Sequence, residues 1–93
     1  MITGLLKIQI CLQGVNSLKD KRRIVKSVIG RLQSRFNVSA AEVDRQDSKQ
    51  EAVIGAAIVS NDMDFLNRQL DGIINFVKGD GRFYVGRIER ELF

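Results

Sequence analysis

The 93-residue sequence contains no histidine, no proline and no tryptophan, and it has only one cysteine. The absence of histidine removes the commonest general base and most transition-metal sites. Cys11 has no second cysteine with which to form an internal disulfide, so a reducing cytoplasm is the expected setting. Cys11 also lies inside a predicted strand without a histidine partner, which indicates a structural thiol rather than a nucleophile.

Long apolar runs are missing as well. No stretch approaches the roughly twenty apolar residues of a membrane helix, and the N-terminus lacks the pattern of a signal peptide. A soluble, cytoplasmic protein without a membrane partner is therefore expected. Hydrophobic residues make up 44% of the chain and charged residues 28%, and there is no linker or low-complexity tract, so residues 1–93 are predicted to form a single domain.

Positive charge is concentrated in one stretch of the chain. The net charge is +4, and Ser17 to Phe36 holds seven of the fifteen Lys and Arg residues but only one of the eleven Asp and Glu residues. This stretch therefore carries a local charge of +6, which leaves the rest of the chain at −2. A basic balance of this kind favours nucleic acid or another acidic partner.

The basic stretch is predicted to form a helix with Ser17 as its N-cap. Apolar residues recur at the spacing of a buried stripe, namely Val25, Val28, Ile29, Leu32 and Phe36. A second face carries cations at i, i+3, i+4 and i+7, namely Lys19, Arg22, Arg23 and Lys26.

Cations at a helix start oppose the macrodipole, whereas the free backbone N–H groups there attract anions. We therefore predict a nucleic-acid- or anion-binding site composed of Ser17, Lys19, Lys21, Arg22, Arg23 and Lys26. A solvated charged face is the alternative interpretation.

Four strands and a second helix complete the predicted fold. The strands cover Leu5 to Leu12, Val38 to Asp44, Ala52 to Val59 and Arg82 to Leu92, and the second helix follows the N-cap candidates Ser60, Asn61 and Asp62. In the last strand, alternation assigns Val85 to one face and Ile88 and Leu92 to the other. The order β-α-β-β-α-β predicts a ferredoxin-like α+β sandwich, a four-stranded antiparallel sheet of order 4-1-3-2 with both helices on one face.

The open face of this predicted sheet has no aromatic residue on either central strand. Base stacking as in RNA-recognition domains is therefore not expected, and nucleic acid would be contacted through its phosphates. The small, mostly apolar residues of the third strand would be covered in a sheet-to-sheet homodimer, and a sparsely apolar open face is the alternative.

No catalytic, metal or cofactor site is predicted. Glu42 and Asp44 are assigned to one face of the second strand, and together with Asp47 they offer few oxygen ligands for Ca²⁺ or Mg²⁺. We interpret them as solvated charges or as ion-pair partners of the basic helix. Gln13-Gly14-Val15 resembles the phosphate loop of acylphosphatases, but Leu18 stands where that family has an arginine, and the family's Gly-Trp-Val-x-Asn segment is absent.

Four groups of short motifs are spread over the chain: Ser17-Leu18-Lys19-Asp20-Lys21-Arg22-Arg23, Phe36-Asn37-Val38-Ser39 with Ala41-Glu42-Val43, Ser60-Asn61-Asp62, and Glu89-Arg90-Glu91. Together they resemble the YlxP-like family of small bacterial proteins of unassigned function, over essentially the whole chain. Arg45, Ser48 and Lys49 stand where a more aromatic segment is expected in that family. The resemblance implies a ferredoxin-like fold, a cytoplasmic setting and a link to translation, because such proteins are typically encoded among translation and ribosome-maturation factors. It brings no catalytic residues.

Three functional hypotheses follow from the sequence. The leading one is a non-enzymatic RNA- or ribosome-binding accessory protein that contacts phosphates through the basic helix. The second is a homo-oligomeric protein-interaction module whose basic helix meets an acidic protein surface. The third is an acylphosphatase-like hydrolase with its phosphate site at Gln13 to Ser17.

Overall fold

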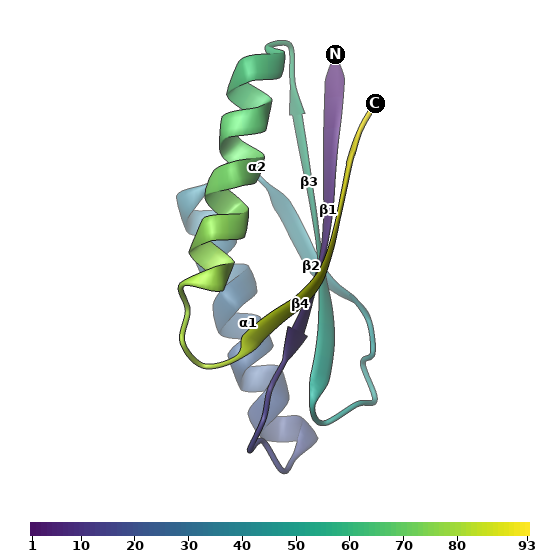
Figure 1. The fold of residues 1–93 in the computed structure, drawn as a ribbon, viewed down its shortest axis with the longest axis vertical. Helices are drawn as coiled ribbons and strands as arrows, with labels where there is room; N and C mark the ends of the chain where they lie inside the picture. Colours follow the sequence, from purple (N-terminus) through teal and green to yellow (C-terminus); the bar gives the residue numbers. More distant parts are fainter.

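The computed structural model describes all of residues 1–93, which form six elements in the order β-α-β-β-α-β. The strands are β1 (Ile2–Cys11), β2 (Ser39–Asp44), β3 (Glu51–Ser60) and β4 (Tyr84–Leu92), and the helices are α1 (Leu18–Arg35) and α2 (Met63–Lys78). The strands form one antiparallel sheet in the order β2-β3-β1-β4. Both helices lie on one side of this sheet (Figure 1). The predicted ferredoxin-like fold and its strand order are confirmed.

Each helix begins at a side-chain cap. The Ser17 hydroxyl accepts a hydrogen bond from the backbone N–H of Asp20 at 3.1 Å, as predicted. Among the three candidates for α2, Asp62 is the cap, because its carboxylate accepts the N–H of Phe65 at 3.1 Å. A cap of this kind stabilises a helix by about 1 kcal/mol, since it satisfies one of the free N–H groups at the helix start.

The hydrophobic core fills the space between the sheet and the two helices. The predicted inward face of β1 is confirmed, and so is the stripe on α1, where Ile29 and Phe36 form the partly buried margin. The core residues are Leu6, Ile8, Ile10, Leu12, Val25, Val28, Leu32, Ala52, Ile54, Ala56, Ile58, Leu66, Leu70, Ile73, Val77 and Phe83. No helix of the structure is both long enough and apolar enough to cross a membrane.

A β-bulge in β2 changes the predicted direction of two carboxylates. Glu42 pairs with Ile54 and Asp44 pairs with Val53, so Val43 is an extra residue on the β2 side. The prediction that Glu42 and Asp44 share a face is therefore wrong. Glu42 lies on the helix side with the buried Ile54, while Asp44 lies on the open side.

A second bulge lies in β4. Ile8 pairs with Ile88 and Ile10 with Val85, so both Val85 and Ile88 pack against the core. The assignment of Ile88 and Leu92 to the face opposite Val85 is therefore wrong. The side chain of Gln9 fills this bulge, where it accepts the N–H of Arg87 at 3.2 Å and occupies the space beside Gly86.

Candidate anion-binding surface

Four cations lie on an exposed side of α1: Lys19, Arg22, Arg23 and Lys26. We call these residues the α1 cationic surface. Another flank of the helix is occupied, because Ser27 accepts a hydrogen bond from Arg82 at 3.2 Å and the Arg35 guanidinium lies 4.8 Å from the ring centre of Phe76. Because α2 and the loop after it cover that flank, helical geometry directs the α1 cationic surface toward solvent, away from α2.

The α1 cationic surface has no carboxylate partner within the protein. The cations that form ion pairs are Lys7, Lys21, Arg45, Arg82, Arg87 and Arg90. Asp20, the one acidic residue of α1, takes part in none of these pairs. An incoming anion would therefore not have to displace an internal carboxylate from these side chains.

Lys21 does not belong to this surface. Its side chain is completely buried, on the inner stripe of α1 that continues as Val25, Val28 and Leu32. The Nζ atom donates hydrogen bonds to the carbonyl oxygens of Arg45 at 2.6 Å, Gln46 at 3.3 Å and Glu51 at 2.9 Å. The expectation that Lys21 contacts an external anion is therefore corrected, because its three donors are all used inside the protein.

Glu42 supplies the charge that balances Lys21. Its Oε2 atom lies 3.1 Å from the Nζ atom of Lys21, and its side chain is only 17% exposed. The three carbonyl oxygens take the ammonium protons, so the buried Oε2 atom is held by charge attraction and has no hydrogen bond of its own. For Glu42, the interpretation as an ion-pair partner of the basic helix is thus confirmed.

The connection between β2 and β3 lies beside the start of α1, because Lys21 holds its carbonyl groups. Figure 1 shows this connection and the first turn of α1 at the same end of the molecule. Its residues Arg45 and Lys49 are exposed, although Arg45 lies 3.8 Å from the carboxylate of Glu51. The site prediction did not include these two cations, because nothing local in the sequence connects them with α1.

An ion pair on the α2 side of α1 helps to fix the orientation of the helix. The Arg82 guanidinium donates to both carboxylate oxygens of Asp80, at 2.6 Å and 2.7 Å, and to the hydroxyl of Ser27. This side-chain hydrogen bond lowers the pKa of Asp80 below its ordinary 3.8 and raises the pKa of Arg82. The positive charge of Arg31 makes a smaller contribution to lowering the pKa of Asp80.

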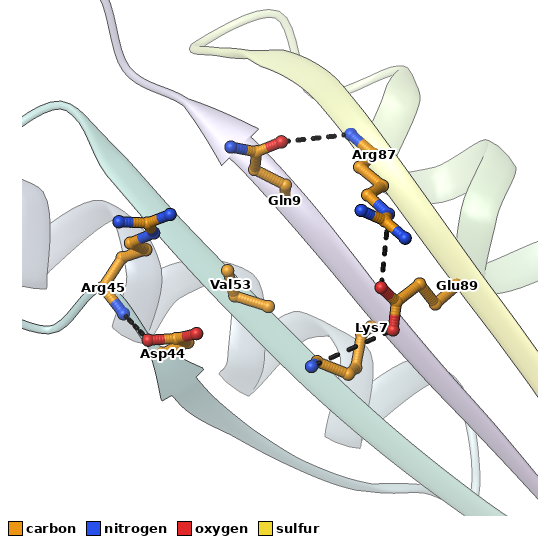
Figure 2. A pocket seen from close by; sticks show the side chains of 7 residues that line it. All are labelled: Lys7, Gln9, Asp44, Arg45, Val53, Arg87 and Glu89. Carbon is orange, nitrogen blue, oxygen red and sulfur yellow. Dashed lines mark hydrogen bonds and ion pairs between the residues drawn. The ribbon is translucent and has the colours of Figure 1, made fainter.

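A hollow of about 280 Å³ lies on the open face of the sheet. Figure 2 shows the residues that line it: Lys7, Gln9, Asp44, Arg45, Val53, Arg87 and Glu89. Glu89 lies 3.2 Å from Nε of Arg87 and 3.9 Å from Nζ of Lys7. Because cations and carboxylates alternate within it, this hollow does not offer the uniform positive potential that a polyanion prefers.

The loop from Gln13 to Ser17 has one feature of a phosphate loop. Gly14 has a φ of 82°, a left-handed conformation that favours glycine. Leu18, at the position of the acylphosphatase arginine, is the first residue of α1. A phosphate at this loop would therefore depend on backbone N–H groups and on Lys19. The structure contains no cluster of three or more His, Cys, Asp or Glu side chains that could hold a metal ion.

Residues 3–90 match the family model described as "Protein of unknown function (DUF503)". The "Uncharacterized protein YlxP" of Bacillus subtilis (strain 168) is 31% identical over 74 residues, which cover 80% of this chain and 80% of that protein. These matches agree with the resemblance carried by the sequence motifs.

Structural comparison adds two more distant similarities. SnoaB, a cofactor-independent oxygenase from Streptomyces nogalater, matches with a TM-score of 0.53 at 12% identity, over 99% of this chain and 90% of that chain. A REP-associated tyrosine transposase bound to a REP hairpin matches with a TM-score of 0.46 at 13% identity, over 98% of this chain and 55% of that chain. The first similarity shows a shared fold alone, and no conclusion about this protein follows from the second.

Proposed function

Because the chain belongs to the DUF503 family of proteins of unknown function, its role has to be inferred from its own residues, and we propose that it is a non-enzymatic, cytoplasmic RNA- or ribosome-binding accessory protein. The α1 cationic surface would contact RNA phosphates, and the backbone N–H groups at the Ser17 end of the helix would complete the site. One observation carries this proposal: four exposed cations at the start of a helix have no internal partner.

The position of these cations supports a binding role because it is unfavourable for the isolated fold. Lys19, in the first turn of α1, opposes the macrodipole at a cost of roughly 0.3–1 kcal/mol, and like charges at i, i+3 and i, i+4 repel one another. Lys19, Arg22 and Lys26 have this spacing. A bound phosphate would relieve both effects at once.

The side chains exposed on the protein indicate whether RNA would be contacted through its bases or through its phosphates. The outward residues of β1 and β3 include no aromatic side chain on which a base could stack. Lys49, in the connection that Lys21 holds beside the start of α1, adds an exposed cation, whereas Arg45 lines the hollow on the open face of the sheet. The exposed aromatic residues Tyr84 and Phe93 lie on the open face of the sheet, on the side away from α1, so phosphate contacts without base readout describe the proposed interface best.

The proposal is tested in cells by crosslinking RNA to the protein and sequencing what is bound. The main variant carries Lys19→Glu, Arg22→Glu, Arg23→Glu and Lys26→Glu, and we expect it to lose most of the crosslinked RNA. A matched pair controls for net charge: Arg22→Gln with Lys26→Gln removes two cations from α1, and Arg68→Gln with Lys78→Gln removes two exposed cations from α2. The first pair should reduce crosslinking and the second should not.

Two other outcomes would replace the proposal. Recovery of one protein partner that survives nuclease treatment, with RNA bound only as loosely as by any basic protein, would identify the α1 cationic surface as a contact for an acidic protein. Steady hydrolysis of a small acyl phosphate that is lost on changing Gly14 or Lys19 would identify an acylphosphatase-like enzyme instead.

A further inference from the structure

We propose that the open face of the sheet is the interface of a homodimer, in which the sheets of two copies stack around a two-fold axis parallel to β1 and β3. This face lies on the side of the sheet away from both helices (Figure 1). The α1 cationic surface belongs to the opposite layer, so the proposal goes beyond RNA binding and does not depend on it.

Exposed apolar side chains are spread over this face, with Val59 and Phe93 beside Thr3 at one end of β1 and Tyr84 beside Cys11 at the other. Val43, Val59, Tyr84 and Phe93 are exposed by 47%, 60%, 68% and 67%, and the strand register places Val59, Tyr84 and Phe93 on the open side. A mostly apolar hollow of about 370 Å³ lies on the same face, where Val43, Gly55 and Ala57 contribute to its lining. A second sheet stacked on this face would cover both the hollow and these exposed side chains.

The sizes of the side chains on the two central strands fit this symmetry. Leu5 of β1 pairs with Ala57 of β3, and both residues are on the open face. The next pair on the open face is Lys7 with Gly55. A two-fold axis between β1 and β3 sets the β1 of one copy over the β3 of the other. Leu5 would then enter the apolar hollow over Ala57 of the partner subunit, so long side chains meet small ones.

One row of charges on this face is self-complementary under the same axis. Asp44 pairs with Val53, Val53 pairs with Gln9, and the Gln9 side chain accepts the N–H of Arg87, so these residues form one row across the sheet. In the second copy, the two-fold axis reverses the order of these residues across the sheet. Asp44 at one end of the row therefore faces Arg87 of the partner subunit at the other end, and the contact occurs twice in the dimer.

The size of the face is also sufficient. The strands run along the longest dimension of the molecule, which is 42 Å. Figure 1 looks along the shortest dimension, 18 Å, and shows the sheet nearly edge-on, so the width of the sheet lies along that dimension. The outline of the open face is of the same order as the about 800 Å² that each partner buries in a standard interface. Stacked sheets align within about 30°, which keeps the paired rows close to register.

The test is sedimentation equilibrium of the full chain with charge-swapped variants. The wild type should sediment at twice its 10.5 kDa mass at micromolar concentration. Asp44→Arg and Arg87→Asp should each raise the dimer dissociation constant about tenfold or more, which corresponds to about 1.4 kcal/mol. The double variant should restore the wild-type constant. Ala57→Arg, which blocks the hollow without touching the charged row, should give a monomer, and thermal unfolding checks that each variant is folded.

Three results would overturn the proposal: a wild type that stays monomeric at every concentration, a dimer that none of the variants weakens, or single variants that weaken the dimer without rescue in the double variant. The α1 variant Arg22→Gln with Lys26→Gln should remain dimeric. A monomeric protein that still binds RNA would overturn the dimer proposal alone. A dimer that does not bind RNA would overturn the proposed function alone.

Discussion

The Nζ atom of Lys21 lies 3.1 Å from the Oε2 atom of Glu42 in the interior of the protein, where the lysine side chain is entirely shielded from solvent. The pair joins α1 to β2, and the same ammonium group binds the carbonyl oxygens of Arg45 and Glu51 at the two ends of the β2–β3 connection. One buried cation therefore holds together the helix, the edge strand and the loop beside the α1 cationic surface.

Replacing Lys21 should destabilise the fold strongly. Lys21→Met leaves the carboxylate of Glu42 buried without a counter-charge and leaves three carbonyl groups without their donor. Removing one partner of a buried ion pair costs about 3–5 kcal/mol. Urea unfolding of the variant and the wild type measures this difference.

A double variant separates the effect of charge from that of packing. Lys21→Met with Glu42→Leu should recover part of the lost stability, because no buried charge remains. An urea midpoint of Lys21→Met equal to that of the wild type would contradict the role assigned to the pair. Where Lys21→Met is folded, it should lose much less RNA affinity than the fourfold α1 variant, because Lys21 does not reach the surface and can act only through the position of the β2–β3 connection.

Removing the α1 cations should stabilise the free protein. Arg22→Gln with Lys26→Gln removes the like-charge repulsion of these residues with their i, i+3 and i, i+4 neighbours on α1, so we expect a gain of roughly 0.5–1 kcal/mol in the free energy of unfolding. The matched pair Arg68→Gln with Lys78→Gln should give no gain, because Lys78 lies in the last turn of α2, where a cation is favourable. Thermal unfolding at low salt compares them, and equal melting temperatures for the two pairs would refute the argument.

The ion pair between Asp80 and Arg82 should make a pH-dependent contribution to stability. The hydrogen bond from Arg82 lowers the pKa of Asp80 below 3.8, so the folded protein binds the proton less readily than the unfolded chain. The contribution is therefore complete above about pH 5 and is lost as the pH falls through 3.8 toward the lowered pKa of the folded state.

The Asp80→Asn variant isolates this contribution. Its melting temperature should be lower than that of the wild type at pH 7, and the difference should shrink as the pH falls below about 4. We expect a loss of about 1 kcal/mol at neutral pH, because the Arg82 side chain is about one-third exposed and solvent screens the pair. A difference that is constant from pH 7 to pH 3 would show that the carboxylate charge has no role.

Local patterns were enough to predict much of this structure. The cap at Ser17, the stripe on α1 and the inward face of β1 are repeated or short-range features of the sequence, and all of them are confirmed. For α2 the sequence offered three cap candidates, of which Asp62 is the cap. The strand order followed from the sequence of elements and from the handedness of the crossovers. These features depend on neighbouring residues or on general chain geometry.

The features that sequence reasoning missed depend on distant partners. The bulge at Val43 exists only in relation to β3, yet it moves Glu42 from the side of Asp44 to the side of the helices. The burial of Lys21 had a signal, because Lys21, Val25 and Val28 lie at i, i+4 and i+7. A lysine is seldom fully buried, however, and only the structure shows the oxygens that compensate its charge.

The central claim, that the α1 cationic surface binds phosphates, is tested most directly by the salt dependence of RNA binding. Purified wild type and the variant with Lys19, Arg22, Arg23 and Lys26 all changed to Glu are titrated with labelled single-stranded RNA at several salt concentrations. If three or four phosphates are neutralised, log K of the wild type should fall against log salt with a slope of about −2 to −4, and the variant should bind at least about tenfold more weakly with a slope near zero. A variant with the same affinity and the same slope as the wild type would contradict the claim.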